Sequence, residues 1–152
     1  MKARTSQESR VARAAARLAA VQALYQADME ATTLAKLLDE FHQHRLGMEL
    51  DDETYAEAET AFFDDVVKGT LARRDEIDAL LSGKLAEGWK IERLDKTMLQ
   101  ILRAGAYELL ARADVPTGSV ISEYLDVAHA FFDEREAKFV NGVLDAVAKV
   151  VR

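Results

Sequence analysis

Three arginines near the start of the chain are spaced so that a helix would carry them on one edge. At about 100° per residue, Arg10, Arg13 and Arg17 fall within an arc of about 60°, beside the apolar stripe of the same helix. An exposed cationic edge of this kind can neutralise the phosphates of a nucleic acid. Tyr25, two turns further along, would offer a ring on which a base could stack. Its direction within the apolar stripe, however, favours core packing for that ring.

A second group of polar side chains is expected near the C-terminus. Lys138, Asn141 and Asp145 share the polar face of a predicted helix, and Phe139 begins its apolar face. Polar side chains beside an aromatic ring can hydrogen-bond and stack on unstacked RNA bases. An ordinary amphipathic helix would show the same arrangement, so the periodicity alone leaves both interpretations open.

The residue types that catalysis or metal binding needs are present, but they are not arranged for either role. The chain has no cysteine, which excludes thiolate ligands and a thiol nucleophile. His42 and His44 would point about 200° apart on a helix and cannot share one ion. Residues 83–90 approach the phosphate-loop pattern, but Trp89 stands where that loop needs its lysine. We therefore expect no catalytic site, no metal and no cofactor.

The net charge of −7 is unevenly distributed along the 152 residues. Residues 1–27 hold five cations and one anion, which gives a charge of +4. Residues 28–88 hold six cations and sixteen anions, and residues 89–152 hold nine and ten, which gives −10 and −1. A basic head on an acidic body suggests an anionic partner at the N-terminus and a basic partner elsewhere. A solubilising arm would explain the basic head equally well.

Composition predicts an all-α fold, a compact bundle of about six to seven helices. Helix-forming residues dominate, and the single proline and seven scattered glycines give no sign of strands. Apolar periodicity predicts helices over the ranges 6–29, 34–46, about 53 to beyond 77 (split at Gly69 or at 73–75), 95–113, 120–131 and 139–150.

Two of these helices have a predicted buried face. The first should bury the stripe formed by Val11, Leu18, Val21, Tyr25 and Met29. The helix over 95–113 has the broad apolar arc of a central helix, and it should end before Pro116. No stretch has the length of a membrane span and no apolar leader is evident, so we expect a cytoplasmic protein without a membrane partner.

Four stretches carry sequences that point to a known family: Ala23–Gln26, Ile101–Leu109, Val115–Glu123 and Lys138–Asp145. In this order they resemble the NusB family of transcription antitermination factors, and the run Lys-Phe-Val-Asn-Gly-Val-Leu is the most specific of them. The likeness covers nearly the whole chain. It implies a single NusB-like domain over residues 1–152, built as an N-terminal helical part at about 5–90 and a C-terminal helical part at about 91–152.

The resemblance also implies partners and an RNA site. NusB-like proteins form a complex with the ribosomal protein NusE, recognise the boxA element of ribosomal RNA leader transcripts and help RNA polymerase read through terminators. By position, Arg13 and Arg17 match arginines that precede the family's Ala-Leu-Tyr. Tyr25 and Phe139 match aromatic residues at the RNA site, and Lys138 and Asn141 accompany Phe139 in its motif.

The chain departs from the family's pattern in two places. Thr97–Gln100 occupies the turn where members often have an acidic residue, a place of contact with NusE. Ser122 replaces the asparagine that usually precedes Glu123.

Two other functions remain open. Certain ribosomal RNA cytosine methyltransferases carry a NusB-like accessory domain, but we expect no cofactor-binding βαβ domain here, because the chain ends soon after the last motif. A purely protein-binding helical adaptor is the other alternative, and it would show no salt-sensitive affinity for RNA.

Overall fold

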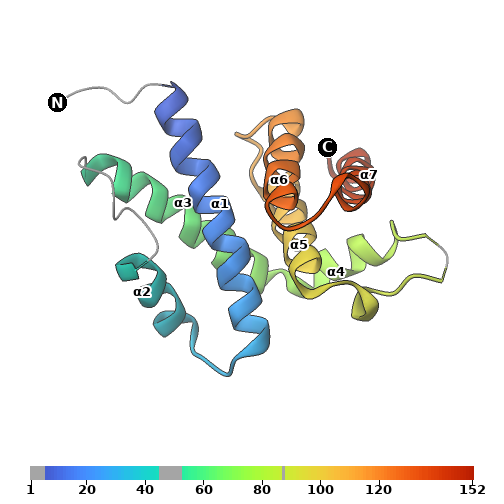
Figure 1. Ribbon diagram of the computed structural model, residues 1–152, viewed down its shortest axis with the longest axis horizontal. Coiled ribbons are helices and arrows are strands. Elements are labelled where there is room, and N and C mark those ends of the chain that lie inside the picture. The colour runs from blue at the N-terminus through green and yellow to red at the C-terminus, as the bar shows by residue number, and fades with distance from the viewer. Residues whose placement is uncertain (1–5, 45–52, 87) are drawn as a thin grey trace. The chain divides into compact units, whose positions relative to one another are not determined.

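The computed structural model describes residues 6–44, 53–86 and 88–152, and all regular secondary structure within these residues is helical (Figure 1). Its elements are α1 (Ser6–Met29), α2 (Leu34–His44), α3 (Glu53–Ala72), α4 (Arg74–Ser82), the 3₁₀ turn η1 (Ile91–Arg93), α5 (Lys96–Ala111), α6 (Thr117–Phe131) and α7 (Glu134–Val151). The all-α prediction is confirmed. Residues 45 and 46, the predicted end of the second helix, lie outside the described residues. Within the described part, no helix is long and apolar enough to cross a membrane.

The chain forms two compact units, an N-terminal unit of residues 1–68 and a C-terminal unit of residues 69–152. Residues 69–90 therefore belong to the C-terminal unit, whereas the sequence placed them with the N-terminal part. The reason lies in α4, which packs on α5 and has Ile77 and Leu81 fully buried. The preceding helix breaks at Arg73, one of the two expected positions, so α4 can turn toward α5.

In the N-terminal unit, α1 buries a different face from the predicted one. Val21 is buried, but Val11 and Met29 are 64% and 55% exposed. The buried face is instead made mostly of small side chains: Ala12, Ala16, Ala19, Ala20, Ala23 and Leu24. Because alanine side chains are short, a neighbouring helix can approach α1 closely, and α2 packs against it. The Phe41 and Phe63 rings stack with centroids 5.5 Å apart and join α2 to α3.

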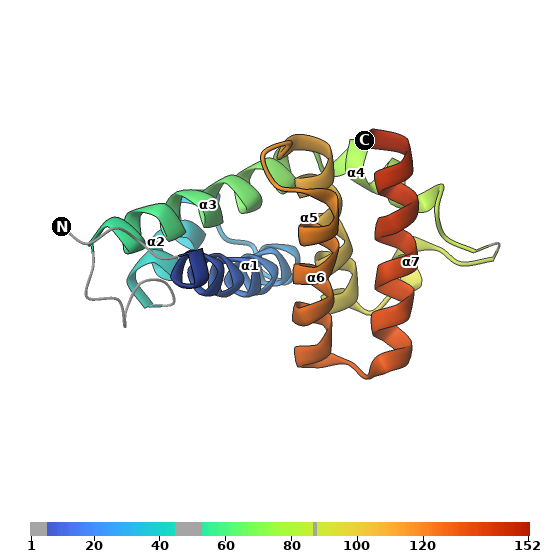
Figure 2. The same ribbon diagram turned by 90° about the horizontal axis from the view of Figure 1, so that it is seen from above.

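The C-terminal unit is built around α5. Every residue from Met98 to Leu109 is buried, as the predicted central helix requires. Helices α6 and α7 pack on α5 and on each other, and the three lie side by side in Figure 2. The close approach of α7 needs Gly105, since a Cβ at this position would lie 2.9 Å from Leu144 Cδ1.

Two charged groups on α5 are buried with partners on neighbouring helices, whereas the buried Gln100 Nε2 atom has no hydrogen-bond partner. Arg103 donates two hydrogen bonds of 2.8 Å each to the Asp78 carboxylate on α4, a paired geometry that fixes the guanidinium in its plane. Glu108 accepts a hydrogen bond from the Tyr124 hydroxyl of α6. Each pair ties α5 to a neighbouring helix, and removal of one partner would leave a buried polar group unsatisfied.

Both ends of α5 are capped. Asp95 accepts hydrogen bonds from the backbone N–H groups of Thr97 (2.8 Å) and Met98 (3.1 Å). At the other end, the Arg152 guanidinium donates to four backbone carbonyls, those of Glu108, Leu109, Arg112 and Val115. Arg152, which directly follows α7, thus satisfies carbonyls that a helix C-terminus leaves unpaired.

We predict opposite stability changes for two glycine-to-alanine substitutions. Gly69→Ala should lower the free energy of unfolding by about 1 to 3 kcal/mol, because the new Cβ would overlap the buried Tyr107 ring. Gly142→Ala should raise it by about 0.5 to 1 kcal/mol, since nothing lies within 4 Å of its Cβ and alanine favours the helix. Urea unfolding followed by circular dichroism measures both. Equal effects of the two substitutions would contradict the close contact at Gly69.

Candidate nucleic-acid interface

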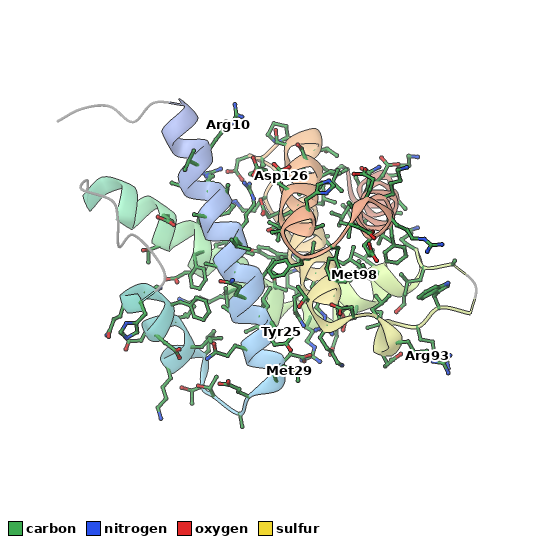
Figure 3. The ribbon with its side chains drawn as sticks, viewed as in Figure 1. Arg10, Tyr25, Met29, Arg93, Met98 and Asp126 are labelled. Atoms are coloured by element: carbon green, nitrogen blue, oxygen red, sulfur yellow. The ribbon has the colours of Figure 1, made fainter. Side chains whose placement is uncertain are left out.

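The seven residues that the sequence singled out lie on two helices, one in each unit. Arg10, Arg13, Arg17 and Tyr25 are on α1, and Lys138, Phe139 and Asn141 are on α7. Figure 3 shows Arg10 near the start of α1 and Tyr25 near its end, an interval of fifteen residues that spans about 22 Å of helix.

Two of the arginines pack on one aromatic ring of α3. The guanidinium carbons of Arg13 and Arg17 lie 4.7 Å and 4.9 Å from the centroid of the Phe62 ring. The ring itself is 3% exposed. Because these two arginines are four residues apart, they face the same part of α3, and each cation is attracted to the electron-rich ring.

The expectation of one exposed cationic edge is therefore wrong for Arg17, whose side chain is only 3% exposed. Arg13 is partly exposed and Arg10 is exposed. The sequence correctly places the three arginines beside a buried face of α1. The Phe62 ring of α3, however, packs on Arg17, which lies nearest to that face and is buried. The cationic surface that remains exposed is formed by Arg10 and part of Arg13.

Tyr25 is more exposed than the sequence predicts. Its place in the apolar stripe favoured core packing, yet 38% of the side chain is exposed. The alanine-lined face of α1 supplies the core instead, which turns Tyr25 and Met29 outward near the end of the helix (Figure 3). The ring is available for stacking.

The start of α7 is fixed by a capping box just before the predicted site residues. The Asp133 carboxylate accepts a hydrogen bond from the Arg135 N–H (3.0 Å), and the Glu136 carboxylate accepts one from the Asp133 N–H (3.2 Å). Hydrogen bonding with Glu136 and then with the backbone N–H groups lowers the pKa of Asp133. The box begins the helix, and Lys138 follows one turn later.

Lys138 and Asn141 are exposed on α7, while Phe139 is only partly exposed. Val140, Val143 and Leu144 form the buried side of the helix. This arrangement places a cation, an amide and a partly open ring within one turn of α7. Cations bind phosphates, amides hydrogen-bond base edges, and rings stack on bases.

Trp89 is a neighbour of Phe139 that the sequence did not reveal. The two ring centroids are 6.3 Å apart with an interplanar angle of 39°, and 57% of Trp89 is exposed. In the sequence this tryptophan only broke a phosphate-loop pattern. Its contact with Phe139 joins residues fifty positions apart, which no local pattern can show.

The histidines do not form a metal pair. His42 is partly buried and hydrogen-bonds Asp64 of α3 through Nε2, whereas His44 is exposed. Among the residues that the structure describes, no cluster of three or more metal-binding side chains occurs.

The segment that departs from the family's acidic turn is largely buried. Met98, Leu99 and Gln100 are in the interior and only Thr97 is partly exposed. Asp95 and Lys96 are the exposed charged residues at this end of α5.

Comparison with known proteins gives one consistent result. A model of the NusB family matches residues 14–149. The chain is 76% identical over 147 residues to the transcription antitermination protein NusB of Novosphingobium aromaticivorans, covering 97% of this chain and 99% of that protein. It is 66% identical to the protein of the same name from Sphingopyxis alaskensis, covering 92% of this chain and 94% of that protein.

Solved structures agree with the sequence comparison. The structure of T. maritima NusB is 33% identical, with a TM-score of 0.76 and coverage of 90% of both chains. A crystal structure of the antitermination factors NusB and NusE in complex with double-stranded RNA contains a chain that is 26% identical, also with a TM-score of 0.76, covering 92% of this chain and 98% of that one. The helices, the α1 and α7 motifs and these matches over nearly the full length place this chain in the NusB family.

Proposed function

We propose that this chain is a transcription antitermination factor that binds boxA-type single-stranded RNA together with the ribosomal protein NusE and promotes read-through by RNA polymerase. The observation that carries the proposal is the full-length match to antitermination factors, one of which was crystallised with NusE and RNA. Two features of the chain itself support it, an exposed arginine on α1 and exposed or partly exposed rings on both helices.

Single-stranded RNA fits the side chains better than a duplex does. Tyr25 and Phe139 can stack only on bases that are not already stacked within a helix. Phosphates alone would require cations but no rings. Each of α1 and α7 carries both a cation and a ring, a combination that is typical of sites for unpaired RNA.

The charge distribution supports two partners of opposite charge. Residues 1–27 carry +4 and would attract RNA, whereas residues 28–88 carry −10 and suit a basic ribosomal protein. Because the RNA-facing charge is small, a second protein that adds contacts to the same RNA would strengthen binding considerably.

We further propose that the chain has no catalytic activity. The buried acid Glu108 is hydrogen-bonded to Tyr124 inside the C-terminal unit, where no substrate could reach it. The curated relatives named above are nearly as long as this chain, so they do not carry a methyltransferase domain beside the matched part. We therefore favour a non-catalytic cytoplasmic factor over the accessory domain of a methyltransferase.

The test of this function is a titration of boxA-type RNA against the chain with and without purified NusE. We predict weak, salt-sensitive binding by the chain alone and tighter binding in the presence of NusE, measured by fluorescence anisotropy of labelled RNA. Linkage requires RNA to tighten NusE binding by the same factor, which calorimetry can measure. Independent binding of RNA and NusE, or no RNA binding under either condition, would contradict the proposal.

Substitution of Arg10 should affect RNA binding, whereas substitution of Arg17 should affect stability. Arg10→Gln should weaken RNA binding and flatten the slope of log affinity against log salt by about 0.7, with stability changed by less than about 0.5 kcal/mol. Arg17→Gln should instead lower the free energy of unfolding by about 1 to 3 kcal/mol, because it removes a buried cation from the Phe62 ring.

Arg17→Lys is the matched control for charge, since it keeps the cation but loses the planar group that stacks on the ring. It should recover only part of the lost stability in urea unfolding. If Arg17→Gln unfolds like the parent chain and binds RNA as weakly as Arg10→Gln does, Arg17 faces RNA and the burial argument is wrong.

A further inference from the structure

We propose that Trp89 and Phe139 together form a platform on which bases of the bound RNA stack, with Trp89 as a second ring that extends the contact beyond α7. The inference rests on the proposed RNA-binding function and adds a residue, Trp89, and a segment, residues 88–93, to its RNA contact. Both rings belong to the C-terminal unit, so the platform is complete within one unit.

Trp89 is a large apolar side chain that remains exposed. Tryptophan is the largest apolar side chain, and 57% of it remains exposed although Ile91 and Leu94, just after it, are buried. A single exposed apolar residue is ordinary. Two aromatic rings with centroids 6.3 Å apart at one surface are a larger feature, and the indole leaves most of its surface open to a ligand.

The backbone around Trp89 has a defined conformation. Gly88 has a φ of +88°, a conformation that residues with a Cβ rarely adopt, and the Trp89 N–H donates to the Ala86 carbonyl at 3.0 Å. Ile91 and Leu94 then anchor the following segment in the core. Because the backbone is already ordered, base stacking on the Trp89 ring has no loop-ordering cost to overcome.

The surrounding charges favour RNA over a protein partner. Each ring has a lysine next to it in the chain, Lys90 beside Trp89 and Lys138 beside Phe139, and both lysines are exposed. Arg93 is exposed on η1 and projects away from the helices in Figure 3. The centres of protein interfaces, by contrast, are depleted of lysine.

The local charge supports the same conclusion. Residues 88–93 hold Lys90 and Arg93 against Glu92, a charge of +1 in a chain whose net charge is −7. Asn141 is exposed one turn after Lys138 and can hydrogen-bond a base edge. Rings for bases, cations for phosphates and an amide for base edges are the three elements of single-strand recognition.

The test uses the fact that Trp89 is the only tryptophan in the chain, so its fluorescence reports on this position alone. The full chain is titrated with boxA-type RNA and with an abasic oligonucleotide of the same length, which carries the phosphates without the bases. We expect RNA to change the Trp89 emission in proportion to binding, and the abasic oligonucleotide to leave it nearly unchanged at matched occupancy.

Substitutions separate stacking from folding. Trp89→Ala should weaken RNA binding by about 5- to 150-fold, the range that corresponds to the loss of one stacking ring, and Trp89→Phe should recover most of the affinity. Phe131→Ala is the matched control, because Phe131 is also an exposed aromatic residue of the C-terminal unit but contacts Phe132 instead of the platform. It should bind RNA like the parent. Thermal unfolding of each variant shows whether the fold is kept.

The outcomes distinguish this inference from the function on which it rests. If labelled RNA binds the parent chain while Trp89 emission stays constant and Trp89→Ala binds equally well, the platform is wrong and RNA binding stands. If Trp89→Ala loses affinity for NusE with its RNA affinity intact, Trp89 belongs to a protein contact and the inference is overturned. If no RNA binds even with NusE present, the proposed function fails as well.

Discussion

The C-terminal unit depends on one constraint, the burial of α5 along twelve consecutive residues. A helix buried in this way has to satisfy its charged groups and its terminal carbonyls inside the protein. Arg103 does so with Asp78 on α4, Glu108 does so with Tyr124 on α6, and Arg152 at the end of α7 caps the final carbonyls. The three neighbouring helices are thus held at defined positions by α5. Phe139 and Lys138 lie where they do because α7 packs on this helix.

In the N-terminal unit the corresponding interaction is the packing of two arginines on Phe62. The basic side of α1 therefore has two parts. Arg17 packs on the ring and is structural, whereas Arg10 is exposed. A cation that stacks on a ring in the fold stays charged and still contributes to the electrostatic potential at the surface. The basic helix can therefore attract RNA even where its arginines do not all touch phosphates.

Helix positions were predictable from the sequence, because apolar periodicity and punctuation are local signals. The range 6–29 was predicted with the limits that the structure has, and the break at Arg73 was one of the two positions expected. Which face of α1 is buried was not predictable in the same way. Hydrophobicity favoured Val11 and Tyr25, whereas close helix packing selected the alanines, a choice that only the neighbouring helices determine.

Local sequence identified residues of the candidate site, but it did not reveal their long-range contacts. Phe139, Lys138 and Asn141 were found through a short motif, and all three reach the surface at least in part. The burial of Arg17 and the pairing of Trp89 with Phe139 both depend on residues distant in sequence, Phe62 in one case and the loop before η1 in the other. Contacts of this kind carry no periodic signal along the chain.

Photo-cross-linking shows whether RNA bases contact the rings of α1 and α7. BoxA-type RNA carrying 4-thiouridine is bound to the chain in the presence of NusE and irradiated, and the cross-linked peptides are identified by mass spectrometry. We expect cross-links in the peptide that contains Tyr25 and in those that contain Trp89 or Phe139. Cross-links found only in other peptides, with these three recovered unmodified, would contradict this expectation.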